Sequence, residues 1–250
     1  TFKKRDTIHL TENYPVERVT TTDIFAHQSI QATAKISIKP GQRYIQFPKS
    51  KIPVGSKYPT FTLQYTKGFS DLFGSDIDFD KWKAEIYDNM KLRLAGEVDY
   101  RFSFGGFLNK NKVTIQDYYH LNSNNVGANI GQNNFRLLGS YIRSNTASFC
   151  SEQHVEYHLN GFITNKLPIL KKKNWNMVLA GHQFMIDSKD YYLEYSVGLE
   201  NIFKLLRVDF VTAINNGKYQ TSSIVIGTGG LLGSGINANG SGNSNVQVSF

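Results

Sequence analysis

Residues 82–94 read WKAEIYDNMKLRL, and apolar and polar side chains alternate along this stretch. The apolar set is Trp82, Ala84, Ile86, Met90, Leu92 and Leu94, and the set between them is Lys83, Glu85, Tyr87, Asn89, Lys91 and Arg93. Asp88 is the exception on the apolar side. A helix would spread the apolar residues around its whole circumference, whereas a strand gathers them on one face. The stretch therefore predicts a β-strand with one apolar and one polar face.

The same alternation recurs on both sides of this stretch. It is present at 30–38, 61–65 and 98–104, and Gly96 separates the last of these from 82–94, which predicts a hairpin. Further strands are predicted near 113–121, 136–149, 151–163, 175–186, 190–199, 206–215 and 219–229. A connector is expected at 42–59, and single helical turns at 167–170 and 202–206. Roughly ten to twelve strands at this spacing are typical of an all-β barrel or a large sandwich.

The chain closes on another alternating stretch, in which Val246, Val248 and Phe250 are apolar and the residues between them are polar. A closing strand with a terminal aromatic residue is typical of outer-membrane β-barrels, whose strands carry alternating faces. We expect a polar lead-in segment at 1–28 and an outer-membrane β-barrel at 29–250. Within the barrel, 230–245 is expected to be a Gly- and Asn-rich loop.

Composition excludes several other classes of protein. No apolar run approaches the ~18 residues that a membrane helix requires. Membrane β-strands also lack such runs, because only their alternate residues face lipid. The formal charge is +8, but most Lys and Arg are dispersed along the chain, so no nucleic-acid partner is expected. Cys150 is the only cysteine, which excludes an internal disulfide and a Cys-based zinc site.

Alternation by itself is compatible with two folds. Lipid cannot hydrogen-bond a free sheet edge, so a membrane sheet must close on itself. A soluble sandwich would bury its apolar faces between two sheets. We predict an all-β, antiparallel transmembrane β-barrel, or the C-terminal part of a larger barrel, with a soluble β-sandwich as the alternative.

Polar residues on the predicted strands include one conspicuous triplet. His154, Glu156 and His158 alternate on one strand and share a face, and Arg207 and Asp209 share a face of another. The two histidines are ~13 Å apart by the strand rise, so one metal ion cannot bind both without a bulge. We interpret all five as a structural polar network in a lumen, and we expect no metal and no cofactor. Ser148 and Ser151 near His154 would complete a hydrolase triad, but no G-x-S-x-G elbow is present.

Asp76, Asp78 and Asp80 form a weak candidate for a calcium loop. Their spacing fits the start of such a loop, whose sixth position requires Gly and whose twelfth requires Glu. Lys81 and Tyr87 stand at those positions instead. The alternative is a solvated acidic loop.

Several longer stretches resemble one protein family. They are GQRYIQFP (41–48), GSKYPTFTLQYTKGF (55–69), GSDIDFDKW (74–82), HVEYHLNGFITNKLPIL (154–170) and YLEYSVGLENIFKLLRVDFV (192–211). They resemble a largely uncharacterised outer-membrane family of Bacteroidota, which pairs an N-terminal carboxypeptidase-regulatory-like domain with a C-terminal barrel. The resemblance implies that this chain is the C-terminal barrel portion of a longer protein in the Gram-negative envelope. It also implies a barrel similar to those of assembly proteins of the BamA/TamA type.

These observations favour a non-enzymatic integral protein of the outer membrane. We expect it to act as a scaffold or partner subunit in envelope assembly, export or uptake, in contact with outer-membrane lipid and other envelope proteins. One alternative is an outer-membrane hydrolase with a lumenal His/Glu site at 154–158. Another is a soluble β-protein that binds glycans through exposed aromatic residues.

Overall fold

The computed structural model describes residues 1–6, 8–13, 19–24, 26–48, 50–122, 133–138, 145–160, 162 and 166–228. The predicted loop at 230–245 and the predicted closing strand ending at Phe250 lie outside the described residues.

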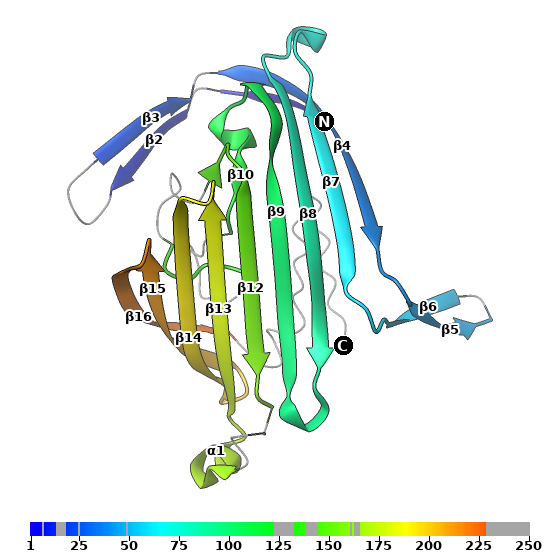
Figure 1. The fold of residues 1–250 in the computed structure, drawn as a ribbon, viewed down its shortest axis with the longest axis vertical. Helices are drawn as coiled ribbons and strands as arrows, with labels where there is room; N and C mark the ends of the chain where they lie inside the picture. Colours follow the sequence, from blue (N-terminus) through cyan, green and yellow to red (C-terminus); the bar gives the residue numbers. More distant parts are fainter. Residues whose placement is uncertain are drawn as a thin grey trace.

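One large antiparallel sheet dominates the structure (Figure 1). Its ten strands follow the order β1-β4-β7-β8-β9-β12-β13-β14-β15-β16, so each strand pairs with the next strand of this sheet along the chain. The strands of the smaller sheets are inserted between β1 and β4, between β4 and β7, and between β9 and β12. In Figure 1 the strands from β4 to β14 stand side by side, and β15 and β16 lie at the left. Their bounds are β1 Phe2–Arg5, β4 His27–Ile38, β7 Thr60–Gly68, β8 Asp78–Lys91, β9 Glu97–Lys112, β12 Cys150–His158, β13 Asn176–Ile186, β14 Asp190–Ile202, β15 Leu206–Asn215 and β16 Lys218–Thr228.

Smaller elements connect these strands. Three two-stranded sheets pair β2 (Ile8–Asn13) with β3 (Val19–Ile24), β5 (Arg43–Phe47) with β6 (Ser50–Gly55), and β10 (Tyr119–His120) with β11 (Asn145–Thr146). Helix α1 covers Pro168–Lys173, and 3-10 turns lie at Leu72–Gly74, Arg93–Ala95 and Ile115–Asp117. None of the helices in the described ranges is long and apolar enough to cross a membrane.

The prediction of an all-β, antiparallel fold is confirmed, but the described residues do not form a closed barrel. The sheet is open, with β1 at one edge and β16 at the other. Nor do the described residues form a sandwich of two large sheets, because every other sheet among them has two strands.

Two of the predicted strands are largely absent from the described residues, and the structure adds detail to two other segments. Only β10 within 113–121 is a strand, and the described part of 136–149 contains only β11, because Phe135–Leu138 crosses one face of the sheet as irregular chain. The connector at 42–59 contains the hairpin β5–β6. Within the lead-in segment predicted at 1–28, β1 pairs with β4 of the large sheet.

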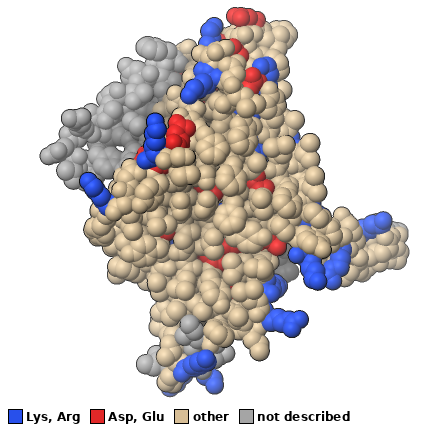
Figure 2. Space-filling model, viewed as in Figure 1, with Lys and Arg blue, Asp and Glu red and all other residues tan. Residues whose placement is uncertain are grey.

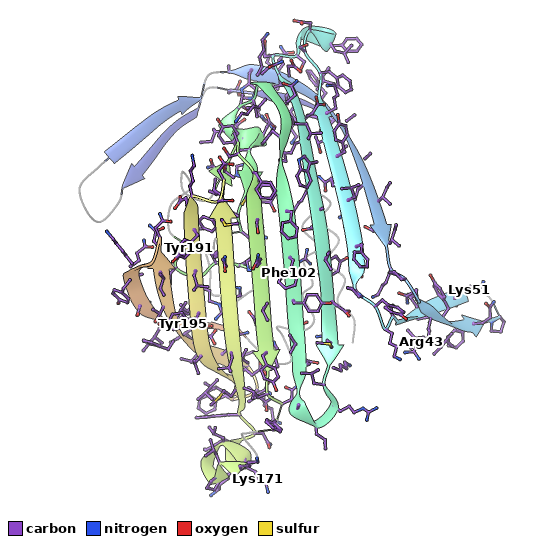
Figure 3. All side chains as sticks on the ribbon, in the orientation of Figure 1. Arg43, Lys51, Phe102, Lys171, Tyr191 and Tyr195 are labelled. Atoms are coloured by element: carbon purple, nitrogen blue, oxygen red, sulfur yellow. The ribbon has the colours of Figure 1, made fainter. Side chains whose placement is uncertain are left out.

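The two faces of the large sheet have opposite character. On the face that we call outer, the register aligns one apolar row across seven strands: Met90, Val98, Tyr157, Leu179, Val197, Phe210 and Ile224. Val197 is 50% exposed and Ile224 is 65% exposed. Figure 2 shows that charged side chains are sparse over the middle of the molecule in this view and gather towards its ends. Figure 3 labels Phe102 on β9 and Tyr191 and Tyr195 on β14. These residues lie on the same face of the sheet as the apolar row.

The opposite face, which we call inner, carries the alternate residues of the same strands. Part of it is a hydrophobic core, formed by Tyr119, Leu121, Phe135, Leu138, Cys150, Phe184, Tyr192 and Ala213. The remainder is polar and yet buried, and it includes most of the predicted site residues. Charged side chains are therefore buried on the inner face while many apolar side chains are exposed on the outer face, the reverse of the usual arrangement in soluble proteins.

Candidate functional site

Two arginines and two carboxylates form a closed ionic ring on the inner face. Arg207 on β15 donates from Nη1 to Oε2 of Glu156 (2.9 Å) and from Nε to both oxygens of Asp209 (2.9 and 3.1 Å). Arg136 donates from Nη2 to Oε1 of Glu156 (2.9 Å) and from Nη1 to Oδ2 of Asp209 (2.7 Å). The side chains of these four residues are at most 4% exposed. Two positive and two negative charges alternate around the ring, so it is neutral as a unit.

The pleat of the sheet places three members of this ring. Glu156 lies on β12 and Asp209 on β15, with β13 and β14 between them, and alternate residues of every strand point to the same face. Arg207 and Asp209 are two residues apart on β15 and therefore share the inner face. Arg136 enters from outside the sheet, in the segment Phe135–Leu138, and its two outer guanidinium nitrogens span the gap between the carboxylates.

A third carboxylate holds the backbone of that entering segment. Glu194 on β14 accepts hydrogen bonds from the backbone amides of Arg136 (2.7 Å) and Leu137 (2.8 Å), and from the hydroxyl of Tyr192 (2.6 Å). Phe135 is fully buried, with its ring centroid 5.0 Å from that of His154 and 5.4 Å from that of Phe184. Segment 135–138 is thus fixed by charge, backbone hydrogen bonds and aromatic packing together.

The predicted histidines have separate partners. Nδ1 of His154 lies 2.9 Å from Nδ1 of His182, and Nε2 of His154 lies 2.9 Å from Oε1 of Glu152, which makes a chain of three buried groups. Nδ1 of His158 lies 3.2 Å from Oε2 of Glu200. Its Nε2 is 3.6 Å from carboxylate oxygens of both Asp99 and Glu156.

The structure therefore brings all five predicted network residues onto the inner face. Glu156, Arg207 and Asp209 belong to the ring, His158 lies beside Glu156, and His154 reaches the ring through His182, whose Nε2 is 3.8 Å from Oε1 of Glu156. Within the described part of the chain, no group of three or more His, Cys, Asp or Glu is arranged to hold a metal ion.

The three aspartates of the candidate calcium loop have different protein partners. Asp76 accepts a hydrogen bond from the backbone amide of Gln28 (2.9 Å). Asp78 accepts from the side-chain amides of Asn109 (3.0 Å) and Asn111 (2.9 Å). Asp80 pairs with Lys67 (2.8 Å) and Tyr65 (2.6 Å). Asp78 and Asp80 lie within β8, so the stretch is partly a strand and its carboxylates cross-link neighbouring strands.

The serines near His154 do not complete a triad with it. Ser151 and His154 are three residues apart on β12, so they point to opposite faces of the sheet. The backbone amide of Ser148 donates to the hydroxyl of Thr146 (3.0 Å). Within the described residues, the carboxylates of the inner-face site are paired, whereas Nε of Arg136, Nη2 of Arg207 and Nε2 of His158 and His182 are buried without a hydrogen-bond partner. The site consists mainly of buried ion pairs and hydrogen bonds, which is the chemistry of a rigid structural core.

Several members of the network were not predicted from the sequence. His182, Glu194 and Glu200 lie at the polar positions of the alternation on β13 and β14, the same signal that pointed to His154, and Glu152 extends the triplet by one step on β12. Arg136 has no such signal, because it lies outside the ladder of the large sheet.

The fold and the site define an all-β protein with an exposed apolar sheet face and a buried inner face that contains a charge-balanced ionic ring. Residues 1–199 match the family model described as the C-terminal domain of a family of unknown function (DUF5686), and the chain belongs to this family. The match begins at residue 1 and so includes the predicted lead-in segment, and it ends before Arg207 and Asp209. No curated protein and no solved structure matches the chain.

Proposed function

We propose that the chain is an integral outer-membrane protein whose large sheet is part of a transmembrane β-barrel, with the outer face against lipid. The observation that carries this proposal is the apolar row from Met90 to Ile224, exposed on one face while charges are buried on the other. In water such a face would be unfavourable by about 25 cal/mol for each Å² of apolar surface left exposed. Hydrocarbon removes that penalty.

Strand length supports the same proposal. A tilted strand needs ~9–11 residues to cross a bilayer. Strands β4 to β16 of the large sheet have 9 to 16 residues each. A sandwich would need a second large sheet over the apolar face, and the described residues contain only two-stranded sheets besides the large one.

The open edges favour a barrel that is larger than this sheet. An unpaired edge cannot persist in lipid, because its backbone amides and carbonyls would have no partners. We infer that further strands of the protein close the barrel between β16 and β1. The resemblance to an outer-membrane family with an N-terminal carboxypeptidase-regulatory-like domain supports a longer protein of this kind.

The inner face supports a structural role more than a catalytic one. Every carboxylate oxygen of Glu156, Glu194 and Asp209 accepts a hydrogen bond from the protein itself. These carboxylates therefore stabilise the fold. We propose a non-enzymatic scaffold or partner subunit in envelope assembly, export or uptake, in contact with outer-membrane lipid and other envelope proteins.

The test compares two adjacent residues of β13 that differ in face. Leu179 is 39% exposed on the outer face, whereas Ala180 is 8% exposed on the inner face. Single cysteines introduced as Leu179→Cys and Ala180→Cys, in a Cys150→Ala background, would each carry a polarity-sensitive fluorophore in the full-length protein reconstituted into vesicles. Brominated lipid should strongly quench the probe at 179 and leave the probe at 180 little changed.

Equal quenching at the two positions would contradict the proposal. So would a full-length protein that remains a monodisperse monomer without detergent or lipid. As a check on folding, both labelled variants should show the same resistance to protease after reconstitution as the unlabelled protein.

A further inference from the structure

The connections between strands of the large sheet fall at two ends. Because successive strands are antiparallel neighbours, the connections after β4, β8, β12 and β14 lie at one end, which we call the basic end. The connections after β7, β9, β13 and β15 lie at the opposite end.

The connections at the basic end contain cations and no anions. Its four connections span residues 39–59, 92–96, 159–175 and 203–205, and they contain no Asp or Glu. Their Lys and Arg in the described residues are Lys39, Arg43, Lys51, Lys57, Arg93, Lys166, Lys171, Lys172, Lys173 and Lys204. In Figure 3, Arg43 and Lys51 lie on the hairpin β5–β6, which projects at the right of the view, and Lys171 lies on α1 at the bottom.

The opposite end differs sharply in charge. Its connections contain Asp71, Asp76, Asp117 and Asp187, together with a smaller number of Lys and Arg. The asymmetry is therefore a property of one end and does not follow from the overall charge of +8.

Hairpin β5–β6 adds exposed apolar surface at the basic end. Tyr44, Ile45 and Phe47 on β5 are 60%, 50% and 45% exposed, and Ile52 and Val54 on β6 are also exposed. The hairpin pairs only with itself and projects from the large sheet, as Figure 1 shows. Apolar and aromatic side chains beside Lys and Arg are the composition of segments that lie in the headgroup layer of a membrane.

We propose that the basic end is a binding surface for anionic lipid, in which Lys and Arg engage headgroup phosphates and hairpin β5–β6 lies in the headgroup layer. The inference rests on the proposed membrane function, since it places this end at one leaflet. Charge complementarity selects the partner, because ten cations with no anion in the connections would attract a negatively charged surface over about a Debye length of 8–10 Å.

The experiment measures lipid selectivity in the reconstituted full-length protein. Spin-labelled phosphatidylglycerol and phosphatidylcholine report the relative association constant of anionic and zwitterionic lipid for the protein surface. We expect the wild type to prefer phosphatidylglycerol by about three-fold or more, and to lose most of this preference in 1 M salt, where the Debye length falls to about 3 Å.

Two triple variants test which end of the sheet causes the preference for anionic lipid. Arg43→Gln, Lys51→Gln and Lys171→Gln together should lower the preference for phosphatidylglycerol clearly below that of the wild type, because they remove three of the ten cations. The matched control neutralises three exposed lysines towards the opposite end, Lys110→Gln, Lys189→Gln and Lys218→Gln, and should retain the preference of the wild type.

The possible outcomes distinguish failure of the lipid-binding surface from failure of the proposed membrane function. A protein that restricts the motion of both spin-labelled lipids, but prefers neither or loses selectivity equally in both variants, overturns the lipid-binding surface and leaves the membrane proposal standing. A protein that restricts neither lipid overturns both.

Discussion

At the scale of single residues, the stability of the inner face depends on complete pairing of its charges. Arg136 is the one ring member that does not lie on the large sheet, and it contacts Glu156, Asp209 and Ser196. A buried ion pair adds little over a well-packed apolar core, but an incomplete pair leaves an uncompensated charge in a medium of low dielectric. The ring therefore constrains which substitutions the fold tolerates.

Replacing Arg136 with Met should lower the free energy of unfolding by about 3–5 kcal/mol, because two buried carboxylates lose a shared partner. Urea unfolding of the reconstituted protein measures the change. Arg101→Met is the control, since the side chain of Arg101 is 30% exposed and pairs weakly with Glu85 at 3.4 Å. That change should cost about 1 kcal/mol or less. Similar losses in the two variants would show that the ring does not behave as a unit.

Asp117 makes a pH-dependent contribution elsewhere in the molecule. Its carboxylate accepts two hydrogen bonds from Arg5 (3.0 Å each), one from Thr114 (2.8 Å) and one from Gln31 (2.8 Å), and so ties β1 and β4 to the turn at Ile115–Asp117. Burial raises the pKa of Asp117, but the hydrogen bonds from Arg5 and Thr114 outweigh it and the pKa lies below its ordinary value.

A carboxyl group with a lowered pKa stabilises the fold above its unfolded pKa of about 4, and this contribution is lost as the pH falls through the folded pKa. The difference in unfolding free energy between wild type and Asp117→Asn should therefore be constant from about pH 7 to pH 5 and shrink below about pH 4. Parallel denaturant titrations across this range measure it. A difference that did not change with pH would exclude the ionised carboxylate as its source.

At the scale of elements, the register of β14 against β15 depends on one glycine. Gly198 lies opposite Asp209, and a Cβ at position 198 would lie 1.6 Å from Oδ1 of that carboxylate. Asp209 cannot turn away without breaking its bonds to Arg136 and Arg207. The absence of a side chain at 198 therefore makes room for the ring.

Gly198→Ala should destabilise the protein by about 1–3 kcal/mol or more, because a methyl group would displace a carboxylate held on two sides. Gly181→Ala on β13 is the matched control, since a Cβ there meets nothing within 4 Å, and its effect should stay within about 0.5 kcal/mol. Thermal unfolding of both variants gives the comparison. Equal effects would mean that the clash is relieved by a movement of β14.

Elements with strict alternation could be predicted from the sequence, and those without it could not. Strands β4, β7, β13, β14, β15 and β16 lie close to their predicted positions. Each of these segments alternates apolar and polar residues, and this local pattern indicates a strand without information from the rest of the chain. The partners of His154 and Glu156 depend on the register between strands, which no single segment encodes. The strand predicted at 136–149 overlaps segment 135–138, whose apolar residues resemble a strand in composition. They pack onto the inner face as irregular chain.

At the scale of the whole molecule, the proposed membrane function requires that lipid, and not water, contacts the outer face. Val197 lies in the middle of β14 and of the apolar row, and it is half exposed. In water a lysine at such a site changes stability by about 0.5 kcal/mol or less. In lipid a lysine near the bilayer midplane of a barrel costs about 2–4 kcal/mol.

Val197→Lys should therefore reduce insertion into vesicles severely, as measured by the fraction of protein protected from protease. Tyr219→Lys is the control, because Tyr219 lies near the beginning of β16 beside Lys218, where the expected cost falls to about 0–1 kcal/mol. If Val197→Lys behaved like Tyr219→Lys, the middle of the outer face would be in contact with water.

The unpaired margins of the sheet carry a constraint of parity. Ten antiparallel neighbours leave β1 and β16 pointing in opposite directions, since each step across the sheet reverses the chain. If the sheet is part of a closed barrel, as we propose, and every neighbouring pair in it is antiparallel, only an even number of further strands fits between β16 and β1. An odd total number of strands would then require one parallel pair at the closing seam.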